Sequence, residues 1–151
     1  MSYSICGVRF RLVCTTSSET AKLRRILEYL FTLVPREGRA EADDIEISVR
    51  TAPSANPPAD AVSGELVFEA PGFSAIRTEH GYHLQSRGSS LTLDLRVGRA
   101  VGWLTSAFMQ AEPEDQRGLF LFAFLLLLSG RGLYGLHAAG VSWNGHGFLR
   151  Q

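Results

Sequence analysis

Residues 6 to 34, CGVRFRLVCTTSSETAKLRRILEYLFTLV, contain the change of hydrophobic period on which the fold class depends. Between Cys6 and Cys14 apolar and polar side chains alternate, which is typical of a strand with one buried face. After Thr16 the apolar residues recur every three or four positions, and a proline ends the pattern. Because Thr16 and Glu19 have the spacing of a capping box, we expect a helix from Ala21 to Val34 that packs on a sheet.

The chain after this helix predicts more short strands. Ile45, Ile47 and Val49 alternate with polar residues, and a loop rich in proline follows. Five apolar stretches separated by glycines then predict an antiparallel meander: Leu66 to Glu69, Phe73 to Thr78, Tyr82 to Ser86, Leu91 to Val97, and Ala100 to Ser106. Gly98-Arg99 suits a two-residue type II′ turn that would pair Val97 with Ala100.

The last forty or so residues predict a helix and a hairpin. Acids and a proline at residues 112 to 115 favour a helix start, and the run from Leu119 to Leu128 is apolar on every side. This run has about half the length of roughly 20 residues that a membrane-spanning helix needs, so we expect a buried helix. Leu136 to Trp143 and His146 to Arg150 read as strands that Asn144-Gly145 joins as a type I′ turn.

Together these elements predict an α+β fold. It has a mainly antiparallel sheet with an N-terminal helix, followed by a buried helix and a β-hairpin. We place a boundary near Gln110, between an N-terminal α+β domain of residues 1–110 and the incomplete start of a second unit at residues 111–151.

Composition limits the classes of partner. The chain has 151 residues, 15 basic and 15 acidic side chains, and 45% hydrophobic residues, which is enough for a packed core. A neutral chain has no global field to hold nucleic acid or anionic lipid, so we expect neither nucleic acid nor a membrane as partner. Cys6 and Cys14 would lie roughly 26 Å apart on one strand, too far for a disulfide, and without a secretory leader we expect a cytoplasmic protein.

The sequence shows no convincing motif for metal binding or nucleotide binding before residue 133, and the partial matches have simpler explanations as turns or solvated faces. His80 and His83 bracket a predicted turn, but nothing nearby supplies further ligands, so we expect no metal site. Gly145-His146-Gly147 resembles a fragment of a dinucleotide fingerprint, but a hairpin turn explains both glycines. Arg9 and Arg11 share the polar face of the first strand, which we interpret as a solvated face, with an acidic peptide as the alternative.

The stretch from Leu133 to Leu149, LYGLHAAGVSWNGHGFL, carries a family resemblance. It resembles the strand pair that precedes the phosphate-binding loop in the HPr kinase-like family of ATP-dependent serine kinases. There an LHA or VHG segment forms one strand, and a G-x-L strand runs into G-x-x-x-x-G-K-[ST]. The apolar run from Leu119 to Leu128 with the Gly-Arg-Gly after it is also similar to this family, so the resemblance covers the chain from Pro113 on.

The resemblance implies a kinase whose ATP-binding loop is not in these residues. Such a loop needs a lysine for the phosphates and a hydroxyl for Mg²⁺, and the only lysine, Lys22, lies in the first predicted helix. The family pattern places the loop directly after Gln151. We therefore expect the N-terminal portion of a serine kinase that phosphorylates a small protein or peptide. The complete enzyme would use ATP and Mg²⁺, whereas we expect no cofactor and no activity for this chain alone.

His137 is the candidate catalytic residue. A two-residue turn at Asn144-Gly145 sets Trp143 opposite His146, and His137 then faces the position after Gln151. By resemblance, the family's strand histidine lies near the transferred phosphate, where it could donate a hydrogen bond or relay a proton. The alternative is a hydrogen-bonded histidine in the core.

A second class of function stays open. The chain could be a stand-alone α+β module that binds a protein or peptide, with the C-terminal hairpin as an exposed edge for association. An unpaired final strand would favour a homo-oligomer or a partner strand. A small metabolic enzyme is disfavoured because no acid, base and nucleophile cluster in the sequence.

Overall fold

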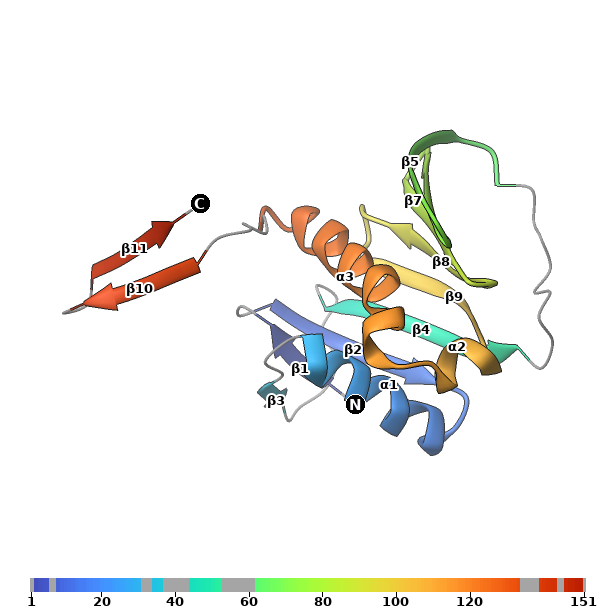
Figure 1. Cartoon of the computed structure of the whole chain (residues 1–151), viewed down its shortest axis with the longest axis horizontal. Helices are drawn as coiled ribbons and strands as arrows, with labels where there is room; N and C mark the ends of the chain where they lie inside the picture. The colour runs from blue at the N-terminus through green and yellow to red at the C-terminus, as the bar shows by residue number, and fades with distance from the viewer. Residues whose placement is uncertain are drawn as a thin grey trace.

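The fold is a mixed β-sheet with helices packed on one face (Figure 1). The computed structural model describes residues 2–5, 8–30, 34–36, 44–52, 62–133, 139–143 and 146–150. The strands are β1 (Ser2–Ile5), β2 (Val8–Cys14), β3 (Val34–Arg36), β4 (Ile45–Ala52), β5 (Glu65–Ala70), β6 (Phe73–Thr78), β7 (Gly81–Ser86), β8 (Ser89–Asp94) and β9 (Arg99–Thr105). The helices are α1 (Ser17–Leu30), α2 (Ser106–Gln110) and α3 (Pro113–Ser129). The described strands of the sheet lie in the order β3-β1-β2-β4-β9-β8-β7-β6-β5.

Most strand pairings in the described part of the sheet are antiparallel, as expected, but its centre is parallel, which the sequence did not predict. β2 and β4 pair in parallel, with Phe10 beside Ile45, and both α1 and β3 lie between them in the chain. β4 also pairs in parallel with β9, where Ile47 lies beside Ala100. Alternation of apolar residues shows that a strand has one buried face but not which way its neighbours run, so the pattern could not reveal this.

Helix α1 begins four residues before the predicted start. The predicted capping box is confirmed, because Glu19 N donates to Thr16 Oγ1 over 3.2 Å and Thr16 N donates to Glu19 Oε2 over 2.8 Å. The buried residues Leu23, Ile26 and Leu27 face the sheet side of the helix. The predicted end at Val34 is wrong, because Val34 belongs to β3, which pairs with β1. Strand β1 itself was not predicted.

The predicted antiparallel meander is confirmed in β5 to β9, but its last turn differs. Asp94 pairs with Arg99, so the turn contains four residues, 95–98, and the predicted pair of Val97 with Ala100 is wrong. The physical reason is a side-chain cap, since Asp94 Oδ1 accepts a hydrogen bond from Arg96 N over 3.0 Å. Gly98, with φ of +67°, closes this turn in the left-handed region.

The core lies between the sheet and the helices α1 and α3. Phe10 of β2 and Phe124 of α3 are almost fully buried and pack edge to face, with ring centroids 5.2 Å apart. The predicted buried helix is therefore confirmed, although Leu125 on its outer side is 36% exposed. None of the helices in the described ranges is long and apolar enough to cross a bilayer.

The predicted C-terminal hairpin is confirmed in strands β10 (Ala139–Trp143) and β11 (His146–Arg150). They form a separate two-stranded antiparallel sheet, drawn beyond the end of α3 in Figure 1. Trp143 lies opposite His146 and Val141 opposite Phe148, which is the predicted register. The boundary predicted near Gln110 stays a prediction, although α3 after it shares its buried cluster with α1 and the sheet.

Candidate functional site

The predicted catalytic residue, His137, lies outside the described residues, and so does the turn Asn144-Gly145. The structure places the strands on either side of that turn. Their ladder begins with Ala139 opposite Arg150, two residues after His137. The register of the hairpin backbone is therefore defined from Ala139 on, whereas the position of the His137 imidazole stays a prediction.

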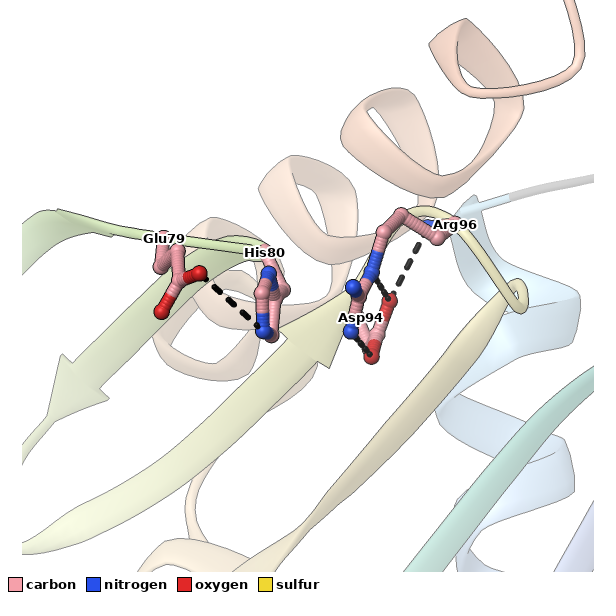
Figure 2. Close-up of polar contacts among 4 residues, drawn as sticks. All are labelled: Glu79, His80, Asp94 and Arg96. Atoms are coloured by element: carbon pink, nitrogen blue, oxygen red, sulfur yellow. Dashed lines mark hydrogen bonds and ion pairs between the residues drawn. The ribbon is translucent and has the colours of Figure 1, made fainter.

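His80 belongs to a surface cluster at two neighbouring turns (Figure 2). Its Nε2 lies 3.7 Å from Glu79 Oε1, and its side chain is 40% exposed. The next turn joins it through the backbone, where Leu95 N donates to His80 O over 3.0 Å. Beside it the Arg96 side chain donates to Asp94, and this hydrogen bond lowers the pKa of Asp94. No three potential metal ligands gather anywhere in the described part of the chain.

His83 does not belong to this surface cluster, because its side chain is buried against the neighbouring strand β8. The side chain is 7% exposed, and Nδ1 forms a hydrogen bond of 2.9 Å with Thr92 Oγ1. Burial lowers the pKa of the imidazole, so the neutral form prevails near pH 7. His80 and His83 therefore do not form a joint site.

The described residues offer no activated nucleophile. Cys14 is partly buried on β2, and burial raises the pKa of its thiol, so it stays protonated near neutral pH. Cys6, the other cysteine, lies outside the described residues. A neutral, partly buried thiol behaves as a small apolar side chain.

A cavity of about 160 Å³ lies at the carboxyl ends of β4 and β9, where open sheets with parallel strands commonly bind ligands. Its lining is Ser18, Glu19, Lys22, Thr51, Ser106, Met109 and Gln110. Glu19 is already engaged in the helix cap, and its pKa is lowered chiefly by a hydrogen bond from Thr51. The exposed Lys22 adds a cation to the same lining, so the charges of Glu19 and Lys22 offset each other and the cavity favours neither an anion nor a cation.

The face of the sheet opposite the helices carries a charged row. Glu46 of β4 accepts hydrogen bonds from Arg11 of β2 and, over 3.1 Å, from Arg99 of β9. Arg9 Nε lies 3.4 Å from Asp44 Oδ1. The prediction that Arg9 and Arg11 share a solvated polar face is thus refined, since both have carboxylate partners: Asp44 directly before β4 and Glu46 on β4.

Beside this row, Arg50 and Trp103 form a pair on neighbouring parallel strands. The guanidinium carbon of Arg50 lies 5.7 Å from the centroid of the Trp103 ring, within the range of a cation–π contact. The pairing of β4 with β9 could not be read from the sequence, and it is this pairing that brings the two side chains together.

Comparison with protein-family models, with curated proteins and with solved structures finds no match to this chain.

Proposed function

We propose that this chain is the N-terminal region of an HPr kinase-like, ATP-dependent serine kinase that acts on a small protein or peptide. The observation that supports the proposal best is the ladder of β10 and β11, with Trp143 opposite His146 and Val141 opposite Phe148. This is the register expected for the strand pair that precedes the family's phosphate-binding loop. In an antiparallel pair the end of β11 lies beside the start of β10, so a loop after β11 would emerge close to His137.

The described residues do not by themselves fit ATP or Mg²⁺. A phosphate-binding loop needs successive backbone N–H groups, a lysine and a hydroxyl residue in one turn. The only lysine, Lys22, lies on α1, whose capping box uses Thr16 and Glu19 for the helix itself. In the proposal the nucleotide therefore belongs to a segment that follows Gln151, and residues 1–151 alone do not transfer phosphate.

The first test is to read the coding DNA after codon 151. The proposal expects codons for G-x-x-x-x-G-K-S or G-x-x-x-x-G-K-T in the same frame or after a single-base shift. The longer protein and residues 1–151 would then be compared for Mg²⁺-dependent transfer from ATP labelled in its γ-phosphate. Transfer by the longer protein alone supports the proposal. Missing loop codons in every frame, or clear turnover by residues 1–151, would overturn it.

His137 would be tested in the longer protein. If His137 assists the transfer, His137→Ala lowers kcat by roughly 10²-fold or more, the range expected for a general acid–base group. His146→Ala, in the facing strand, is the matched control and should leave kcat nearly unchanged. Equal losses in the two variants would assign His137 to the support of the hairpin.

One observation favours a second candidate, a protein-binding module. β5 ends the sheet among the described strands, and Leu66, Val67 and Phe68 on it are 54%, 37% and 43% exposed. An exposed apolar edge strand can accept a further strand from another chain. Sedimentation over a range of concentrations tests this, because a chain that stays monomeric at the highest concentration would speak against an associating edge.

A further inference from the structure

The face of the sheet opposite α1 and α3 carries charged and apolar side chains that the proposed kinase function does not use. We call it the open face, and it consists of Arg9, Arg11, Val13, Asp44, Glu46, Ser48, Arg50, Arg99, Val101 and Trp103. The register sets these side chains in rows across β2, β4 and β9. No helix of the described part of the chain packs on these rows, since α1 and α3 pack on the opposite, buried positions.

The open face carries more positive than negative charge. Four guanidinium groups stand against the carboxylates of Asp44 and Glu46, which leaves a net charge of +2. Asp94, opposite Arg99 on β8, does not change this balance because it is paired with Arg96. Glu46 is shared by Arg11 and Arg99, so one carboxylate serves two cations. Arg50 has no ion pair with a described carboxylate and lies over the Trp103 ring instead. Arg11, Arg50 and Arg99 are thus able to take further carboxylate groups.

Apolar surface lies between these cations. Val13 and Val101 are 37% and 46% exposed, and each flanks Ser48 on its own side of β4. The Arg50–Trp103 pair adjoins this row one step further along the strands. Contact with an apolar side chain here would remove both valines from water, which favours binding of an apolar group.

The combination selects the class of partner. Guanidinium groups bind carboxylates through two parallel hydrogen bonds, and the valines between them need an apolar group of the ligand. A nucleic acid would place phosphates against the valines and would find only a small excess of positive charge. We propose that the open face binds an acidic polypeptide segment that carries apolar side chains between its carboxylates. The proposal concerns polypeptide binding and does not depend on ATP.

Fluorescence anisotropy with a short labelled peptide of Glu, Val and Ser tests the proposal, with Gln in place of Glu in the reference peptide. We expect the acidic peptide to bind and added salt to weaken binding. Arg50→Gln and Arg99→Gln should each raise Kd roughly three- to tenfold, and Val101→Ser should raise it also. Arg24→Gln is the matched control, because Arg24 is exposed on α1 and pairs with Glu28.

A second readout covers variants that fold poorly. In a Trp143→Phe background, Trp103 is the only tryptophan, so its emission should change when the acidic peptide binds. Equal binding of the Gln peptide, an equal loss in Arg24→Gln, an unchanged Trp103 emission at saturation, or tighter binding of a single-stranded oligonucleotide would each overturn the proposal.

Discussion

His83 and Thr92 face each other across β7 and β8, with Nδ1 and Oγ1 2.9 Å apart, and the imidazole is almost fully buried. On the other side, Ile76 of β6 lies opposite His83. Neither neighbouring strand therefore places a charge directly beside the ring, and burial alone lowers the pKa of His83. Nε2 is buried and has no hydrogen-bond partner among the described residues. Protonation of this ring would place a charge where nothing compensates it.

The free energy of unfolding should therefore fall in mild acid. The pKa of His83 is lowered from 6.5 in the folded chain, so below about pH 6.5 the unfolded chain binds the proton more readily. This part of the stability is complete above that pH and is lost as the pH falls toward the folded pKa. His83→Asn keeps a polar partner for Thr92 but does not titrate, so urea unfolding at about pH 7.5 and pH 5.5 should show a smaller difference than in the parent chain. His80→Gln is the control, and an equal reduction in both variants would contradict this assignment.

The hydroxyl group of Thr105 is expected to stabilise the folded chain. Thr105 is the N-cap of α2, where Oγ1 accepts a hydrogen bond from Phe108 N over 3.1 Å, while Thr105 N donates to Ser89 Oγ over 2.9 Å. Thr105→Val keeps the shape but leaves the Phe108 N–H buried without this partner, so it should lower the free energy of unfolding by about 1–2 kcal/mol. Thr105→Ser restores the acceptor and should recover most of that loss in urea denaturation. A serine variant as unstable as the valine variant would show that the methyl group, not the cap, matters.

Two neighbours on α3 should respond very differently to truncation. Phe124 is 1% exposed and packs against Phe10, whereas Leu125 is 36% exposed. Phe124→Ala should cost about 3–5 kcal/mol because it leaves a cavity against β2, and Leu125→Ala should cost less than about 1 kcal/mol. The midpoints of chemical denaturation give both values. Similar losses would mean that the outer side of α3 is as well packed as its inner side.

The sequence predicted those elements whose signals are local. Thr16 and Glu19 are three residues apart, so their reciprocal hydrogen bonds could be read from spacing. The alternation in β2 and β4 identified their buried faces. The direction of neighbouring strands is not a local signal. Ile47 would be buried in the same alternating pattern whether β2, with Leu12, and β9, with Ala100, ran parallel or antiparallel to β4. Helix α2, with five residues, is too short to show a helical period.

The same distinction between local signals and sheet topology holds for the candidate sites. The register of β10 and β11 follows from two turn residues and the pairing that they impose, and it is confirmed. Arg9 and Arg11 were recognised as one polar face, but Asp44 and Glu46 became their partners only through the parallel pairing of β2 with β4. Such contacts depend on topology, which periodicity cannot supply.

Replacing glycine by alanine should lower the free energy of unfolding at Gly102 and raise it at Gly118. Gly102 lies on β9 at a close approach to β8, where a β-carbon would overlap the carbonyl oxygen of Ser90 and come within 2.9 Å of Leu91 Cα. Because backbone atoms cannot rotate away, Gly102→Ala must separate the two strands, and we expect a loss of several kcal/mol in the free energy of unfolding, on the scale of other overpacked cores.

Gly118 lies within α3, and a β-carbon there would meet nothing closer than Phe73 Cδ2 at 3.8 Å, an ordinary contact. Gly118→Ala should stabilise the chain by about 0.5–1 kcal/mol, since alanine restricts the unfolded backbone and favours the helix. Urea denaturation of the two variants beside the parent chain measures both signs. If Gly102→Ala were neutral, the close contact between β8 and β9 at Ser90 and Leu91 would have to be revised.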